Sequence, residues 1–285
     1  MSTATRSGVG ANPPAMSRRH AAGAASGRGL LFTILGEYVL PSGGSAWTSA
    51  LIEIMGRLEV EEKATRQALM RTSADGWLTP ERVGRRTRWH LTPSAERLLT
   101  GGTKRIYGFG SRRLDWDGGW LLVLARAPET ERPARHLLRT RLTWAGFGSP
   151  SPGVWISTHA DRLGEVQDVL KEAGLSEEAQ IFRGTHVGGG QLQAMVQQAW
   201  DLPAIEAMYN EFMAAFADRT PRDPLARTIE LVHAWRRFPW IDPDLPRQLL
   251  PSHWSGDKAA SLFMRRHAQW ADAAAASWLS LSAHD

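Results

Sequence analysis

Apolar residues recur at helical spacing in two segments near the start of the chain. Residues 30–40 (LLFTILGEYVL) are strongly apolar and are followed by Pro41-Ser42-Gly43-Gly44, which predicts a buried helix that ends at this turn. Residues 45–55 predict a second helix, in which Ser45 is placed to cap the first turn. The apolar face of this second helix comprises Trp47, Leu51, Ile54 and Met55.

A third helix is predicted from Glu61 to about Ala74, after a break at residues 56–60. Its first turn is acidic, as the helix dipole favours, and Asp75-Gly76 is typical of a helix end. The side chains expected on its buried face are Thr65, Leu69 and Thr72. The side chains left on the other face are Lys63, Arg66, Gln67, Met70 and Arg71. Because Arg and Gln make bidentate contacts with guanine and adenine, this second face is a candidate for reading DNA bases.

The segment after this helix alternates between apolar and cationic positions. Thr87, Trp89 and Leu91 fall on one side of a predicted strand, which is the period of half-buried β-structure. The cationic residues of this hairpin are Arg82, Arg85, Arg86, Arg88 and His90. We therefore predict a winged helix-turn-helix DNA-binding domain over residues 28–100, and a solvated charged face is the alternative explanation of the same arginines.

Apolar runs alternate with helical patterns from about residue 115 on. Strands are predicted at residues 120–125, 154–157 and 180–183, and helices at residues 131–145 and 161–173. The inward positions of these helices are Leu137, Leu138 and Leu142, then Leu163, Val166, Val169 and Leu170. The order favours a β-α-β-β-α-β, ferredoxin-like α/β domain with one strand not evident, because residues 148–153 have the composition of a turn.

The remaining segments complete a multidomain α+β protein. Thr92 or Ser94 can cap a helix that runs through Leu99 and is interrupted by Gly101-Gly102, so this part is predicted to be a connector. Helical spacing returns after Gly188-Gly189-Gly190, in residues 191–200, 203–217, 224–238 and 258–281. We predict a disordered tail at residues 1–27, a connector and ferredoxin-like domain at 101–187, and a C-terminal helical domain at 188–285.

Composition narrows the class of protein. With 285 residues, 42% hydrophobic content and 13 Trp, the chain can bury substantial cores. It has no Cys, which excludes disulfides, thiolate metal sites and cysteine nucleophiles. No apolar run is long enough for a membrane helix or a secretory signal, so we expect a cytoplasmic protein with no membrane partner.

The basic excess is confined to the first part of the chain. Lys and Arg outnumber Asp and Glu by 15 to 8 in residues 1–110, whereas acidic residues outnumber basic ones by 21 to 19 in residues 111–285. Attraction to phosphate is electrostatic and independent of base sequence. The asymmetry therefore indicates which part faces a polyanion such as double-stranded operator DNA, and not which sequence is bound.

Several separated motifs resemble the PaaX family of bacterial transcriptional repressors, over residues 29 to about 270. They are Gly76-Trp77-Leu78, the arginine hairpin, residues 116–120, residues 144–148 with 152–157, and residues 233–240 with Leu249-Leu250-Pro251. The resemblance implies a winged helix, a ferredoxin-like middle domain akin to a small CRISPR adaptation nuclease, and a helical C-terminal domain. It also implies a homodimeric repressor of phenylacetate catabolism that phenylacetyl-CoA or a related acyl-CoA releases from its operator.

An enzyme, above all a metal-dependent nuclease built on the middle domain, is the main rival. Such a site needs a carboxylate at the end of its first strand to hold Mg²⁺, but residues 120–125 are followed by Arg126. Asp115 and Asp117 precede the strand and fit a turn better, and the nine His have no metal-ligand spacing. We therefore expect no catalytic residues, no bound metal and no cofactor.

An acyl-CoA effector would need Arg near an aromatic-lined cleft, because it joins phosphates to an apolar end. The candidates are Trp116, Arg135, Trp144, His233, Trp235, Arg236 and Trp240. For each Trp, packing in a core is the alternative explanation, and Trp120 and Trp155 are expected in cores. A nucleic-acid-binding protein with no effector also remains open.

Overall fold

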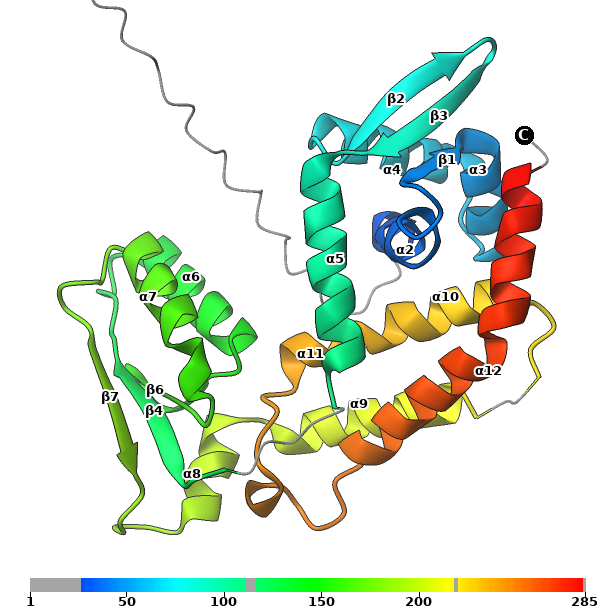
Figure 1. Cartoon of the computed structure of the whole chain (residues 1–285). Helices are drawn as coiled ribbons and strands as arrows, with labels where there is room; N and C mark the ends of the chain where they lie inside the picture. The colour runs from blue at the N-terminus through cyan, green and yellow to red at the C-terminus, as the bar shows by residue number, and fades with distance from the viewer. Residues whose placement is uncertain (1–26, 111–115, 218–219, 284–285) are drawn as a thin grey trace, which may run out of the picture. The chain divides into compact units, whose positions relative to one another are not determined.

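The computed structural model describes residues 27–110, 116–217 and 220–283 (Figure 1). The chain divides into two compact units. The first unit comprises the residues up to Gly102 together with those from Trp278, and the second comprises Thr103–Ser277. Residues 1–26 of the predicted tail lie outside the described residues, and Gly27 already begins a helix. The structure is thus a mixed α and β protein with two antiparallel sheets, as the sequence indicates.

Three helices form the core of the first unit. α2 (Gly27–Ile34) continues into a π-helical turn, η1 (Leu35–Val39), and is followed by α3 (Thr48–Arg57) and α4 (Glu62–Ala74). The apolar positions expected in this core are buried, with Leu51, Ile54 and Met55 at 0% exposure. The three helices therefore enclose one apolar centre, as their hydrophobic periodicity predicts.

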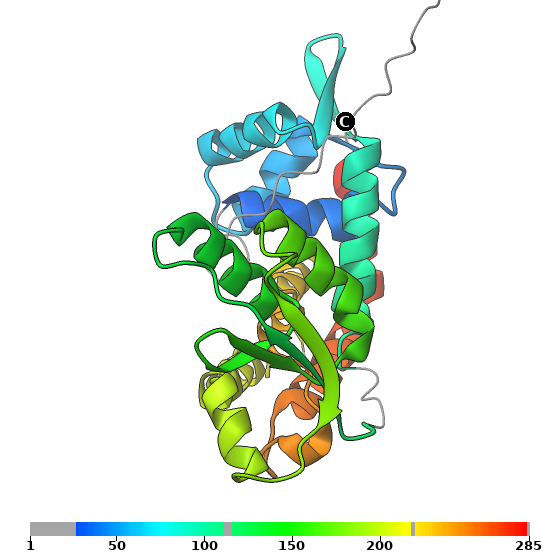
Figure 2. The same cartoon turned by 90° about the vertical axis from the view of Figure 1, so that its left-hand side faces the viewer.

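A three-stranded antiparallel sheet completes the first unit, in the order β1-β3-β2. β2 (Leu78–Val83) and β3 (Arg86–Leu91) form the hairpin that projects beyond the helices in Figures 1 and 2. β1 (Ser45–Trp47) corrects the prediction that a helix begins at Ser45, because Ser45 pairs with His90 and the helix starts at Thr48. The backbone of β1 finds partners on a strand that is distant in the sequence, which helical spacing does not reveal.

α5 (Pro93–Gly108) begins in the first unit and ends in the second. Thr92 caps it, since Thr92 Oγ1 accepts the amide of Ala95 at 3.2 Å. The predicted interruption at Gly101-Gly102 is wrong, because the helix is continuous through both glycines. Each glycine costs a helix only about 1 kcal/mol, and residues on either side, such as Leu99 and Tyr107, are held by packing.

The second unit contains a four-stranded antiparallel sheet in the order β5-β6-β4-β7 (Figure 2). Its strands are β4 (Gly119–Leu124), β5 (Gly148–Ser151), β6 (Val154–Ser157) and β7 (Gln180–Thr185). α6 (Arg132–Trp144), the turn η2 (Ala160–Arg162) and α7 (Leu163–Glu172) complete this part of the chain. Leu121 and Val123 of β4 pack with α6 and α7, whereas Trp120 packs with the C-terminal helices. The sheet is therefore covered on both faces.

Two expectations for this part of the chain are wrong. Residues 148–151, expected in a turn, form β5. Gly148 pairs with Ile156, and a Cβ on Gly148 would lie 2.4 Å from the Trp200 ring, so the small residue permits both contacts. Leu163, expected to face inward, is 40% exposed, because α7 begins only at this residue after the turn η2.

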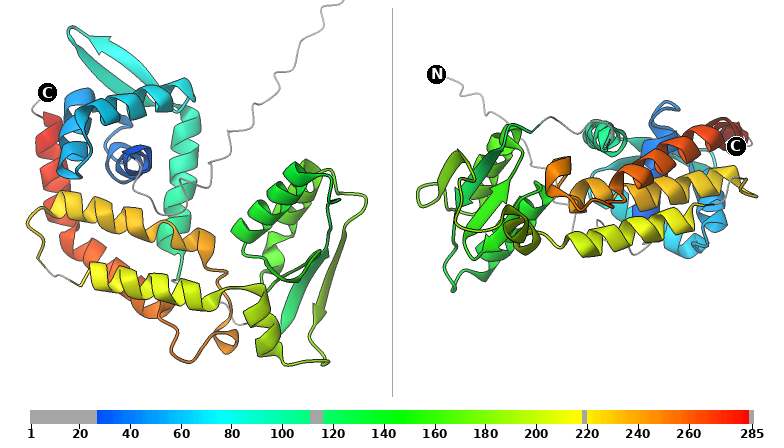
Figure 3. Two further views of the ribbon diagram at one scale, coloured as in Figure 1. Left: turned by 180° about the vertical axis from the view of Figure 1, so that it is seen from behind. Right: turned by 90° about the horizontal axis from the view of Figure 1, so that it is seen from below.

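The C-terminal helices pack around aromatic side chains. They are α8 (Leu192–Ala199), α9 (Leu202–Ala215), α10 (Pro224–Trp235), α11 (Phe238–Ile241), the turn η3 (Arg247–Leu249) and α12 (Gly256–Ala283). In Figures 1 and 3, α9, α10 and the first half of α12 lie side by side. Asp201 and Asp223 cap α9 and α10 through their side chains. Within the described ranges, no helix is long and apolar enough to cross a membrane.

Candidate nucleic-acid interface

α4 is held by its buried face and presents the other to solvent. Leu69 lies in the core, and the hydroxyls of Thr65 and Thr72 donate to the carbonyl oxygens of Glu61 (3.2 Å) and Ala68 (2.7 Å). These three buried residues are the ones that the sequence predicts. Because both hydroxyls are satisfied within the helix, they can be buried at little cost.

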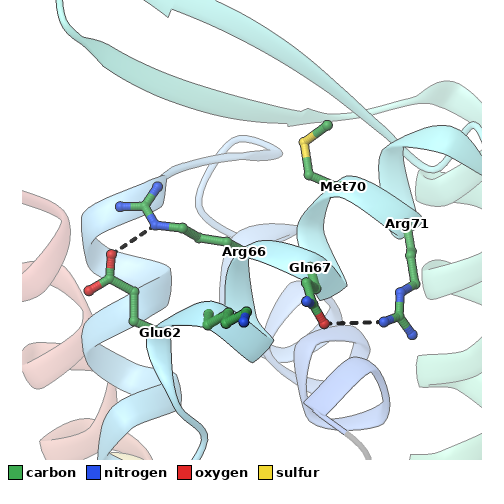
Figure 4. Close-up of a pocket in the computed structure, with 6 residues that line it drawn as sticks. Glu62, Arg66, Gln67, Met70 and Arg71 are labelled. Atoms are coloured by element: carbon green, nitrogen blue, oxygen red, sulfur yellow. Dashed lines mark hydrogen bonds and ion pairs between the residues drawn. The ribbon is translucent and has the colours of Figure 1, made fainter.

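The five side chains proposed to read DNA line a shallow pocket on the exposed face of α4 (Figure 4). They are Lys63, Arg66, Gln67, Met70 and Arg71. Arg66 Nε donates to Glu62 Oε1 at 2.8 Å, and Arg71 donates to Gln67 Oε1 at 3.3 Å. Both bonds join exposed residues four apart on one helix, and such contacts are worth only about 0.3–0.5 kcal/mol. The two guanidinium groups can therefore exchange these partners for a ligand.

The hairpin presents further arginines of the first unit. Arg82, Arg85 and Arg86 are exposed around the turn, where Gly84 has a φ of +62° that suits glycine. Arg88 differs from them, because its guanidinium lies over the Trp47 ring at 5.5 Å and its Nε is buried without a partner in the described structure. Three of the four arginines are thus available to a partner, and the fourth packs within the sheet.

These positions define what the surface can do chemically. A helix with fork-shaped guanidinium donors can form paired hydrogen bonds with base edges, and an arginine hairpin next to it in sequence can neutralise phosphates. On the hairpin, His90 Nε2 and Glu81 Oε2 lie 2.7 Å apart, which offsets part of the positive charge near the base of the strands. The strongest cationic character therefore lies at the tip and along α4.

The seven residues predicted to bind an effector do not come together in one place. Trp235 is fully buried, stacks on Phe263 at 4.9 Å and donates its indole N–H to the carbonyl of Ile106 at 3.2 Å. Arg236 is also largely enclosed, and burial lowers its pKa to about 10. His233 precedes them on α10 and is half-buried.

Trp144 and Trp240 form a separate cluster with Arg105 of α5. The two rings meet edge to face with centroids 6.1 Å apart, and the Arg105 guanidinium lies 3.8 Å from the Trp240 ring centre. Arg105 also donates to the carbonyl oxygens of Trp144 (3.1 Å) and Pro239 (3.0 Å). Burial, followed by the nearby Arg162, lowers the pKa of Arg105. This cluster holds the end of α5 within the second unit.

Trp116 precedes Asp117, which lies in a turn before β4, as the sequence predicts. Asp117 Oδ1 accepts the amide of Gly119 at 2.8 Å, and Asp117 Oδ2 pairs with Arg183 at 2.6 Å. The Gly119 amide and then Arg183 hold the pKa of Asp117 below its ordinary value. The carboxylate is thus engaged in the turn, and the part of the chain that the structure describes contains no cluster of three potential metal ligands.

Of the seven predicted effector residues, Arg135 lines a cavity of about 980 Å³ in the second unit. Five neighbours in this cavity were missed by the sequence analysis, namely Arg126, Arg132, Arg139, Trp155 and Trp200. One signal was available, because Arg132, Arg135 and Arg139 follow an i, i+3, i+7 spacing that places three cations on one helix face. The contributions from β6 and α8 come from distant segments and had no such signal.

Comparisons with known proteins cover most of the chain. Residues 26–95 match the model of the PaaX-like protein, residues 113–196 that of the PaaX protein central Cas2-like domain, and residues 200–280 that of the PaaX-like protein C-terminal domain. The chain is 31% identical over 265 residues to the Transcriptional repressor PaaX of Escherichia coli (strain K12), covering 88% of this chain and 82% of that protein. Among solved structures, the uncharacterized protein Rv0674 from Mycobacterium tuberculosis is similar in fold, with a TM-score of 0.61 and 21% identity over 88% of this chain and 98% of that one.

Proposed function

Because the chain belongs to the PaaX family, a family of transcriptional regulators and not of enzymes, we propose that it is a DNA-binding repressor of phenylacetate-type catabolic genes. The observation that supports this most directly is the exposed face of α4, with Arg66, Gln67 and Arg71 on one side of a helix whose other side is buried. The E. coli relative is a transcriptional repressor by name. DNA binding in the cytoplasm follows as part of the proposal.

The first unit supports the proposal through its arrangement. α3 and α4 are consecutive helices joined by a short turn, and the β2–β3 hairpin follows α4 directly. We infer that this is a winged helix-turn-helix in which α4 enters the major groove and the arginines at the hairpin tip contact the backbone or the minor groove. Arg82, Arg85 and Arg86 are the exposed residues suited to that second role.

The second unit would supply assembly and control. Its element order, β4-α6-β5-β6-α7-β7 with sheet order β5-β6-β4-β7, supports a ferredoxin-like domain, followed by a helical C-terminal domain. We propose that these parts hold a homodimer, because two α4 helices must be spaced by about one turn of DNA, or a multiple of it, to bind a two-fold symmetric operator. The first unit alone would then bind weakly.

An acyl-CoA, with phenylacetyl-CoA as the first candidate, is the proposed effector. It can release the operator only by binding the DNA-free arrangement of the dimer more tightly than the DNA-bound one. The free acid lacks the phosphates that arginine side chains hold, so it should not act. A repressor without any effector is the alternative within the same class of function.

The test is a titration of the full-length protein against a labelled duplex that the protein itself selects from a random pool. We expect tight, salt-sensitive binding of the selected duplex, release by phenylacetyl-CoA, and no release by phenylacetate. Equal affinity for selected and random duplexes would contradict sequence-specific repression. Specific binding that no acyl-CoA weakens would instead favour the repressor without an effector.

A further inference from the structure

The cavity in the second unit lies where the two apolar cores of that unit meet. Trp155 belongs to the core between the sheet and helices α6 and α7, whereas Trp200 belongs to the core formed with the C-terminal helices. Both rings line the cavity, and its volume of about 980 Å³ is in the range of small-molecule sites. The cavity is therefore bounded by the sheet on one side and by the helical part on the other.

One wall of the cavity is cationic. Arg132, Arg135 and Arg139 lie on one face of α6 and span about 10 Å along the helix axis. Each is exposed, and none forms an ion pair or side-chain hydrogen bond within the described part of the chain. Arg126 adds a fourth guanidinium, and its link to Glu129 is long at 3.7 Å and exposed at both ends. The wall therefore has room for more than one phosphate group.

The rest of the cavity lining is largely apolar and aromatic. Trp155 and Trp200 are part of this lining, and each residue is only 8% exposed, so both are held in place by the surrounding cores. Met208 and Phe147 line the same cavity and add further apolar surface for the apolar end of a ligand.

Negative charge at the cavity is weak. Two carboxylates line it, Glu129 and Asp201. Asp201 Oδ1 already accepts the amide N–H of Ala204 and so caps α9. Four guanidinium groups and His136 thus face two carboxylates, of which one is engaged by the backbone. An anion is the charge type that this balance favours.

We propose that this cavity is the effector site, and that it takes a ligand with phosphates at one end and an acyl or aryl group at the other. The phosphates bind Arg126, Arg132, Arg135 and Arg139, and the apolar end lies against the aromatic and aliphatic lining that includes Trp155, Trp200 and Met208. This inference rests on the proposed function for the identity of the ligand as an acyl-CoA. Of the residues predicted from the sequence for this role, it retains Arg135.

The first test measures heats of binding of phenylacetyl-CoA to the full-length protein without DNA. The variant replaces Arg132, Arg135 and Arg139 together by Ala, and the control is Arg141→Ala on the same helix, whose side chain pairs with Glu172 away from the cavity. We expect the triple variant to lose about tenfold in affinity per arginine, because each replacement removes a charge-assisted contact with the ligand. The control should bind as the wild type does.

The possible outcomes distinguish failure of the proposed effector site from failure of the proposed function. Operator affinity without ligand should be the same in the triple variant and the wild type, because α6 is not part of the proposed DNA surface. If the wild type binds its operator and the ligand, but the triple variant binds the ligand equally well, the cavity is not the site while the repressor remains. If the wild type binds its operator and phenylacetyl-CoA gives no heat, the site proposal fails. Failure to bind any operator contradicts the proposed function itself.

A second test uses the absence of cysteine from the chain. Ala204→Cys places a single thiol at the cavity, and Ala273→Cys places one on an exposed position of α12 as a control. Bound phenylacetyl-CoA should slow alkylation of the first thiol, by about tenfold at ten times the Kd, and leave the second unchanged. Equal rates for the first thiol with and without saturating ligand would overturn the assignment.

Discussion

The arginines of α4 and those of α6 occupy similar positions, on one exposed face of an amphipathic helix, but they differ in what surrounds them. Arg66 of α4 has an acidic partner on its own helix and lies among other polar side chains. Arg135 of α6 faces a cavity with an aromatic wall. A helix face that is open along its length suits an extended polyanion, whereas one beside an apolar cavity suits a small ligand with one charged end. We therefore propose different partners for the same residue type in the two units.

The tryptophans of the second unit also differ in their surroundings. Replacement of Trp235 is expected to have the largest effect on stability. This ring is fully buried, whereas Trp155 and Trp200 reach the cavity. Trp235→Ala should lower the free energy of unfolding by about 3–5 kcal/mol, because it removes the stack on Phe263 and leaves a void. Denaturant unfolding measures this loss.

A milder variant keeps the comparison decisive if the alanine variant does not fold. Trp235→Phe retains a ring and removes the hydrogen bond to Ile106, so we expect a smaller loss of stability and an unchanged affinity for phenylacetyl-CoA. Trp116→Ala, at a partly exposed position, is the control and should destabilise less. A stable Trp235→Phe protein that no longer binds the ligand would place the effector at Trp235 and not at the cavity.

The α4 surface is tested by Arg66→Ala, with the next largest effect. Loss of a good base interaction should lower operator affinity by about 1–3 kcal/mol, and thermal stability should hardly change because the ion pair with Glu62 is exposed. Arg57→Ala is the matched control, since Arg57 pairs with Glu53 in the same i,i+4 geometry on α3. Fluorescence anisotropy with selected and random duplexes measures both. An equal loss on both duplexes would mean that Arg66 contacts only phosphate.

The sequence predicts α4 well because all the information is local. Its acidic first turn, its apolar positions and the Asp75-Gly76 end lie within one window, and the observed helix starts only one residue later than predicted. β1 and β5 could not be predicted in the same way, because each becomes a strand only through a partner elsewhere, such as His90 for Ser45. Strand pairing of this kind is set by tertiary contacts and not by the three or four residues involved.

The two candidate sites also differ in how much of each could be predicted from one segment of the sequence. The five residues of α4 proposed to contact DNA follow from the periodicity of one helix, so exposure of all five could be anticipated. The cavity needs α6, the sheet and α9 to meet, and only the spacing of Arg132, Arg135 and Arg139 is visible in one segment. A Trp gives little guidance by itself, because a large aromatic side chain packs in a core at Trp235 and lines the cavity at Trp200.

The hairpin arginines sharpen the comparison within the first unit, with a smaller effect. Replacing Arg82, Arg85 and Arg86 by Gln should make the negative slope of log affinity against log salt less steep, by about 0.9 for each phosphate that is no longer neutralised. Arg88→Gln should change this slope less and thermal stability more, because the Arg88 guanidinium lies over the Trp47 ring. Titrations at several salt concentrations provide the slopes. An unchanged slope in the triple variant would show that the hairpin is not at the DNA.

The smallest expected effect concerns Asp117, which gives the second unit an exposed ion pair of the kind that α4 has. Asp117→Asn keeps an oxygen that can accept the Gly119 amide and removes the charge that attracts Arg183. Its folded-state pKa is lowered from the ordinary 3.8, so the stabilisation by the charge is present above that value and is lost as the pH falls through the lower, folded-state pKa. The wild type should therefore have a slightly higher Tm than the variant at pH 7. This difference should stay constant down to about pH 5 and shrink below about pH 4, because the carboxyl group then becomes protonated. Thermal melts from about pH 7 to about pH 2.5 measure this difference in Tm.

The same two proteins test whether Asp117 binds a metal. Addition of Mg²⁺ at neutral pH should not raise the Tm of either protein. A rise in Tm with Mg²⁺ that the variant lacks would show that Asp117 binds a metal and is not simply a turn residue.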